Sequence, residues 1–124
     1  MVEAVKQIML YVNDQQATAD FWVEKLGFTI VANEKNGGFH FIEMKPNPAS
    51  ETSIVLHNKE MIAKMSPEMN VGTPSLMFSV ADVSAEHQRL KEAGVKVGEL
   101  TQMPFGTVFN FCDNEENYFA VSSK

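Results

Sequence analysis

Hydrophobic and polar positions alternate along two segments of the chain, one in each half. The segments are 7–14, QIMLYVND, and 75–82, SLMFSVAD, and their apolar, polar and acidic positions coincide. Strict alternation of this kind predicts a β-strand with two different faces. An amphipathic stretch follows each segment and ends at Leu26-Gly27-Phe28 in one half and at Ala93-Gly94-Val95 in the other. The repeated order indicates a tandem duplication.

The amphipathic stretches predict two helices, at about 15–25 and 84–93. Asp14 and Asp82 precede them, where a carboxylate can accept hydrogen bonds from the free amides of the first turn, so both are predicted N-caps. Gly27 and Gly94 are predicted to end the helices, since glycine readily takes a positive φ. The apolar stripe predicted for the first helix consists of Ala17, Phe21, Trp22 and Leu26.

Each predicted helix is followed by segments typical of strands. In the first half these are 28–32, 39–44 and 53–57, with a hairpin turn at Asn36-Gly37-Gly38. In the second half they are 95–102, 107–112 and 118–122, with a tight turn at 113–117. A connection that contains one short helix is expected between the halves. The pattern predicts an α+β fold of tandem βαβββ repeats that form a curled mixed sheet around a cavity.

Length and composition narrow the class of protein. A chain of 124 residues predicts a single domain, with repeat one at about 1–60, a connection at about 61–72 and repeat two at about 73–124. The net charge of −6 argues against a nucleic-acid partner. No apolar stretch is long enough for a membrane span and no signal peptide is recognisable, so a cytoplasmic protein is expected. The lone Cys112 is interpreted as a buried strand thiol.

The sequence resembles the vicinal oxygen chelate superfamily, which includes glyoxalases, bleomycin-resistance proteins and extradiol dioxygenases. The resemblance covers nearly the whole chain and implies a glyoxalase-like fold. The residues that carry it are 8–14, Phe21-Trp22, Leu26-Gly27-Phe28, Phe105-Gly106 and the run 111–119, FCDNEENYF.

The resemblance also implies where a metal would be held. Enzymes of this superfamily bind a divalent ion through His and Glu on the first, fourth, fifth and eighth strands. The matching positions here hold Gln7, Val55, Ser75 and Ala120. Valine and alanine cannot coordinate, and a neutral amide or hydroxyl does not compensate a divalent charge. The prediction is therefore a member of the superfamily without the usual metal ligands, with no metal, no other cofactor and no assigned catalytic residue.

A displaced metal site remains an alternative, with His57, His40 and Glu43 as the nearest donors. His40 and Glu43 are three positions apart on one predicted strand and so point to opposite faces, which weakens a joint ligand set. A lyase, isomerase or dioxygenase that uses such a centre, or that uses His57 or Tyr11 as an acid or base, is the alternative function. His87, within the second helix, is interpreted as solvent-facing.

The inward positions of the strands predict a small-molecule site. An apolar wall with a few polar groups is typical of such pockets, although the same residues could simply fill an interior. The predicted ligand-binding residues are Gln7, Met9, Tyr11, Val55, His57, Ser75, Met77, Tyr118 and Ala120. The leading hypothesis is a metal-free homodimer that sequesters an aromatic or cationic small molecule, as bleomycin-resistance proteins do. A structural or regulatory module that uses its β edges only to dimerise is a third possibility.

Overall fold

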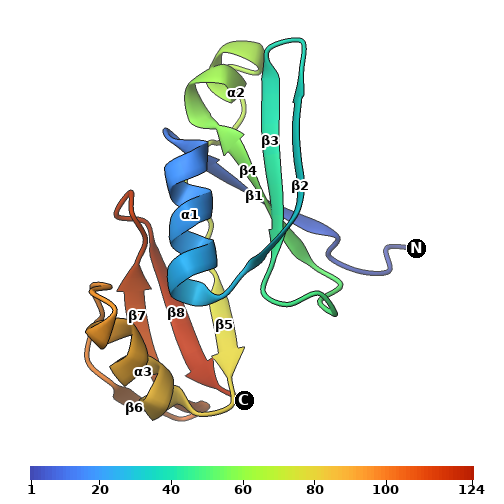
Figure 1. Cartoon of the computed structure of the whole chain (residues 1–124). Helices are drawn as coiled ribbons and strands as arrows, with labels where there is room; N and C mark the ends of the chain where they lie inside the picture. Colours follow the sequence, from blue (N-terminus) through green and yellow to red (C-terminus); the bar gives the residue numbers. More distant parts are fainter. The chain divides into compact units, whose positions relative to one another are not determined.

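A computed structural model describes residues 1–124 and divides the chain into two compact units, Met1–Thr73 and Pro74–Lys124. Both contain a strand, a helix and three further strands in that order, which confirms the duplication and the α+β class (Figure 1). The short helix expected after the first repeat is also present. No helix has the length and apolar character needed to cross a bilayer.

Unit 1 is a four-stranded mixed sheet with one long helix on one face. Its elements are β1 (Gln7–Val12), α1 (Gln15–Leu26), β2 (Thr29–Asn36), β3 (Phe39–Lys45), β4 (Ser53–Asn58) and α2 (Lys59–Met65). The strand order is β1-β4-β3-β2, with β1 parallel to β4 and the other neighbours antiparallel. The β2–β3 hairpin turns at Gly37 and Gly38, whose φ values of 60° and 83° suit glycine and confirm the predicted turn.

Unit 2 repeats this plan with shorter strands. Its elements are β5 (Met77–Val80), α3 (Val83–Glu92), β6 (Thr101–Met103), β7 (Gly106–Cys112) and β8 (Tyr118–Ser123), and the sheet order is β5-β8-β7-β6. The prediction of a strand at 95–102 was wrong for most of this range. Only an isolated bridge between Val97 and Phe111 precedes β6. Gly98 and Glu99 at the centre of this segment lower its β propensity, which is consistent with the short strand.

The helix boundaries follow from local chemistry. The carboxylates of Asp14 and Asp82 accept hydrogen bonds from the amides of Ala17 and Ala85, both at 3.0 Å, and this confirms both predicted N-caps. Gly27 ends α1 in the left-handed conformation with a φ of 75°. The chain therefore enters each helix at the same point of the repeat.

The buried stripe of α1 differs from the predicted one. The helix buries Gln15, Thr18, Ala19 and Trp22, whereas Ala17 is exposed and Phe21 and Leu26 are only half-buried. Gln15 is buried because its amide donates to the carbonyls of His40 at 2.8 Å and Leu56 at 2.9 Å. A polar residue thus satisfies two strand carbonyls beneath the helix, which hydrophobic periodicity could not reveal. Trp22, fully buried, is the one member of the predicted stripe that lies in the core.

Candidate functional site

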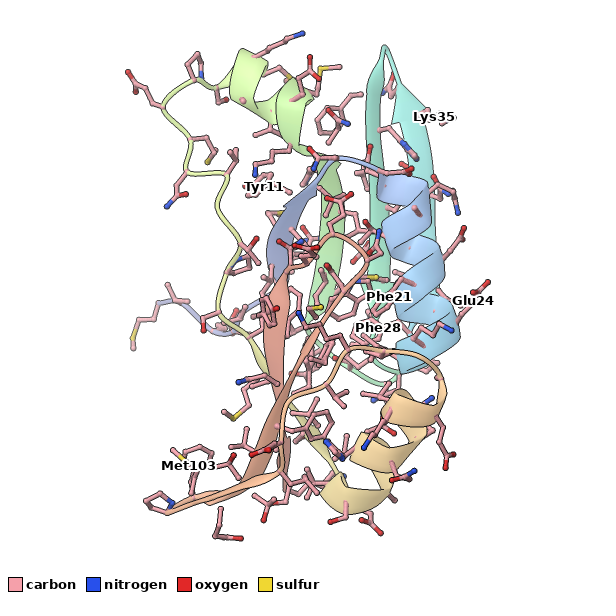
Figure 2. All side chains as sticks on the ribbon, turned by 90° about the vertical axis from the view of Figure 1, so that its left-hand side faces the viewer. Tyr11, Phe21, Glu24, Phe28, Lys35 and Met103 are labelled. Carbon is pink, nitrogen blue, oxygen red and sulfur yellow. The ribbon has the colours of Figure 1, made fainter.

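The two faces of the unit 1 sheet differ in what covers them. On the α1 side, Leu10, Val12 and Leu56 are completely buried. The opposite side, here called the far face of unit 1, carries the alternate positions of the same strands. In Figure 2, Tyr11 lies at the left beside β1, and α1 lies at the right. The far face consists of Gln7, Met9, Tyr11, Ser53, Val55, His57, Phe39, Phe41 and Glu43, with Glu34 and Lys45 toward its margin.

Four rings form a connected cluster on this far face. The ring centroids of Tyr11 and His57 are 6.1 Å apart and the rings are stacked. Phe39 lies 5.6 Å from His57 and 6.4 Å from Phe41. All four side chains are half-buried, so part of each ring remains accessible within unit 1. Flat, partly exposed rings provide a surface on which an aromatic ligand can stack.

His57 contributes an unusual polar group to this cluster. Its Nδ1 atom is buried and has no hydrogen-bond partner. Burial lowers the pKa of the His57 imidazole below its ordinary value of 6.5, because the charged form loses solvation. The ring is therefore neutral at physiological pH. Its buried nitrogen is uncompensated, which costs stability in the folded chain.

The lowered pKa of His57 predicts an acid-dependent loss of stability. As the pH falls below about 6.5, the unfolded chain binds this proton more readily than the folded chain, so protonation favours unfolding. We expect His57→Gln to lose less stability than the wild type between about pH 7 and pH 5, measured by urea unfolding at each pH. His40→Gln, which leaves His57 in place, is the matched control and should keep the wild-type loss. Equal pH dependence of His57→Gln and wild type would contradict this account.

Glu43 lies on the far face beside the aromatic cluster. The Ser53 hydroxyl donates to its Oε2 at 2.6 Å, and the Gln7 amide donates to the same oxygen at 3.3 Å. Gln7 at the family's metal position is thus engaged with a carboxylate. Sequence reasoning considered Glu43 only as a partner for His40. Glu43 is paired in register with Val55, a predicted site residue. This pairing could not be predicted, because it depends on β3 lying next to β4 in the sheet.

His40 lies on the α1 side of the sheet, opposite to His57 and Glu43. Its Nε2 is 2.7 Å from the Asn33 Oδ1, and both side chains line a polar pocket of about 500 Å³. The other residues of this pocket are Asn13, Asp14, Gln15, Gln16, Lys35 and Asn58. The prediction that His40 and Glu43 point to opposite faces is confirmed. The three donors considered for a displaced metal site, His57, His40 and Glu43, therefore do not point to a common place.

The donor set does not fit a divalent metal. No three His, Cys, Asp or Glu side chains lie close enough together to hold one. At the positions where the superfamily places its ligands, Val55 and Ala120 have no donor atom, and Gln7 donates its amide to Glu43. A metal centre needs converging anionic or imidazole ligands, and this chain does not supply them.

The remaining predicted site residues belong to unit 2. Met77 pairs with Ala120, and Tyr118 pairs with Cys112, so these side chains share the face opposite Phe78 and Phe119. Met77 and Tyr118 are 53% and 55% exposed, and the Lys96 ammonium lies 5.9 Å from the Tyr118 ring centroid. Ser75 is exposed and lies two residues before β5, not within it.

The structure thus brings the predicted residues together in two groups. Gln7, Met9, Tyr11, Val55 and His57 share the far face of unit 1, and Met77, Tyr118 and Ala120 share a face of unit 2. That the two groups form one site stays a prediction. Phe39, Phe41 and Ser53 were missed, although their alternation with Ile42 and Ile54 was a usable signal.

His87 is half-buried, so it is less solvent-facing than the sequence predicted. Its Nε2 lies 2.8 Å from the Gly98 carbonyl, and its ring packs edge-on against Phe109 with centroids 5.0 Å apart. The polar neighbours of His87 in the sequence concealed this contact, which depends on β7 lying beneath α3. His87 therefore has a packing role within unit 2.

Two curated relatives match nearly the whole chain. The uncharacterized protein YetH of Bacillus subtilis is 35% identical over 123 residues, which are 98% of each chain. The uncharacterized protein YurT of the same organism is 32% identical over 120 residues, which are 93% of this chain and 94% of that protein. Neither description states an activity.

Solved structures share the fold. TnmS3, an antibiotic binding protein from Streptomyces sp. CB03234, has a TM-score of 0.84 and 28% identity over 98% of this chain and 96% of its own. Lactoylglutathione lyase from Agrobacterium tumefaciens has a TM-score of 0.77 at 18% identity over 98% of this chain and 94% of its own, which establishes the fold alone. The glyoxalase-like fold predicted from the sequence is confirmed.

A family model described as the Glyoxalase/Bleomycin resistance protein/Dioxygenase superfamily matches residues 4–121. The match spans both repeats and includes both N-caps and the turn glycines described above. The chain belongs to the glyoxalase/bleomycin resistance protein/dioxygenase superfamily.

Proposed function

We propose that this protein is a small-molecule-binding member of its superfamily that works without a metal and sequesters an aromatic or cationic ligand as a homodimer. The observation that carries the proposal is the far face of unit 1, where four half-buried rings form a cluster and one of them is the neutral imidazole of His57. Such a surface offers stacking area and one polar contact, which is the usual composition of a ligand site. The expected cellular location is the cytoplasm.

The similarity to TnmS3 supports binding as the activity. TnmS3 is described as an antibiotic binding protein, and it aligns with this chain over nearly its whole length at 28% identity. The chain also lacks the converging ligands on which metal-dependent members of the superfamily rely. A protein that retains the fold and an aromatic face but not the metal donors is suited to holding a ligand unchanged.

A lyase, isomerase or dioxygenase remains the second candidate, and His57 is the observation that favours it. A neutral, half-buried imidazole has the basicity needed to accept a proton from a substrate. General acid–base catalysis would also need a stabilised negative charge in the transition state. The far face of unit 1 instead carries the carboxylate of Glu43, which disfavours an anionic intermediate, so binding is preferred.

Methionine methyl resonances can test the proposed function. Met9 on the far face of unit 1 is 36% exposed, whereas Met44, on the opposite side of the same sheet, is completely buried. With methyl-labelled methionine, we expect an aromatic antibiotic that binds to shift the Met9 resonance and leave the Met44 resonance in place. A panel of planar aromatic antibiotics, titrated and followed by NMR, provides the measurement.

The same titration separates the two candidate functions. Sequestration predicts that the ligand is recovered chemically unchanged after prolonged incubation, whereas an enzyme would convert it. A Met77 shift that saturates together with Met9 would support one site built from both groups of predicted residues. If no member of the panel moves Met9 at high concentration, the proposed function is wrong.

A further inference from the structure

We propose that Glu43 is the charge-recognising residue of the far face of unit 1 and binds a protonated nitrogen of a flat aromatic ligand. The inference rests on the proposed function and deepens it, because it names the ligand class as an aromatic cation. The amidinium group, planar and rich in N–H donors, is the chemical type that such a carboxylate accepts best.

The hydrogen bonds of Glu43 are one-sided. Ser53 Oγ and Gln7 Nε2 both donate to Oε2, at 2.6 and 3.3 Å. The Oε1 atom receives no donor from the protein. Ser53 is 1% exposed and sits on the central strand β4, so its hydroxyl holds the carboxylate in a defined orientation. One oxygen is thus fixed by the protein and the other is left for an external donor.

A half-buried carboxylate is costly unless it is compensated. Removing a charge from water is unfavourable without hydrogen bonds or an opposite charge. Glu43 forms no ion pair, although Lys45 lies two residues further along the same strand face. Neutral donors on Oε2 offset part of the cost and leave the negative charge intact. A ligand cation would supply the missing compensation.

The other charged groups on the far face of unit 1 do not change its net negative charge. Glu34, exposed on β2, pairs in register with Phe41, and Lys45 lies at the end of β3 next to Thr29. His57 is neutral because burial lowers its pKa, and no charged residue on β1 belongs to this face. Two carboxylates and one ammonium leave the face negative. The face is therefore complementary to a cation.

The aromatic cluster specifies the rest of the ligand. Phe41 is two residues from Glu43 on the same strand face, and His57 is two residues beyond Val55, the register partner of Glu43. A ligand nitrogen at Oε1 would thus place an attached ring system beside Phe41 and His57. Ring faces also attract the charge of the cation itself. An aromatic cation uses both features, whereas an aliphatic amine uses only the carboxylate.

A matched pair of probes tests the role of Glu43. Naphthalene carboxamidine and naphthalene carboxamide have nearly the same shape and both carry N–H donors, but only the amidine is charged at neutral pH. We expect the wild-type protein to bind the amidine about tenfold more tightly, as measured by titration of the Met9 methyl resonance. Glu43→Gln should weaken amidine binding about tenfold and leave carboxamide binding unchanged.

Glu34→Gln is the control, because it removes the same charge from an exposed position of the same face. Its effect on amidine binding should stay below about twofold. If circular dichroism shows that Glu43→Gln does not fold, two measurements still decide the question. They are the preference of the wild-type protein for the amidine over the carboxamide and the binding of the amidine to Glu43→Asp, which keeps the charge. Equal binding of both probes would overturn the role of Glu43 and leave the proposed function standing. Failure of all aromatic ligands to move Met9 would overturn both.

Discussion

Replacing Trp22 with alanine will lower the free energy of unfolding by about 3–5 kcal/mol. Trp22 is a completely buried residue of α1, and its ring meets Phe28 edge-on with centroids 5.0 Å apart. Truncation removes the largest buried side chain of unit 1 and leaves a cavity between helix and sheet. Urea unfolding followed by far-UV circular dichroism measures the change.

Val23→Ala is the control for Trp22→Ala. Val23 is the next residue of the same helix, but it is 37% exposed, so its truncation should cost less than about 1 kcal/mol. Similar losses in the two variants would mean that burial does not set the cost, because alanine favours the helix at both positions. That result would contradict the assignment of Trp22 to the core of unit 1.

Replacing Phe109 with alanine will lower the free energy of unfolding by a similar amount, about 3–5 kcal/mol. Phe109 is only 1% exposed, and its ring packs against His87. Phe109 belongs to unit 2, whereas the only tryptophan, Trp22, belongs to unit 1. Trp22 fluorescence therefore reports on unit 1 alone. The prediction of a single domain implies that the fluorescence midpoint falls together with the circular dichroism midpoint in Phe109→Ala.

Asn110→Ala is the control for Phe109→Ala, since Asn110 is an exposed neighbour on the same strand and should change stability little. If the Trp22 transition stays at the wild-type midpoint while part of the circular dichroism signal unfolds early, the units unfold independently. The single-domain prediction would then be wrong, although the large effect of Phe109 on unit 2 would remain.

Local chemistry explains why much of the fold could be predicted. Asp14 and Asp82 act through hydrogen bonds three residues away, and Gly37 and Gly38 act through their own φ values, so each signal is contained in a few neighbouring residues. The errors lie where long-range contacts decide. The segment 95–102 forms a strand only where β7 reaches it, and Gln15 is buried because two carbonyls of distant strands accept its amide.

The candidate site was predicted in part for the same reason. Alternation placed Met9 with Tyr11 on one face of β1 and Val55 with His57 on one face of β4, and the resemblance to the superfamily implied that both faces point inward. Glu43 was examined in the sequence only beside His40, because its register with Val55 depends on β3 lying next to β4. Strand order is a property of the folded sheet, and it cannot be read from the spacing within one strand.

The sequence by itself determined the duplication, the positions of the caps and turns and, through its resemblance to the superfamily, which residues stand at the family's metal positions. Each of these depends on residue identity or on contacts between near neighbours. Only the tertiary structure decided that Glu43 joins the aromatic cluster, that His40 lies on the opposite side of the sheet, and that the buried Nδ1 of His57 has no partner. These features require strands distant in sequence to be paired, because pairing sets which side chains share a face and which are removed from water.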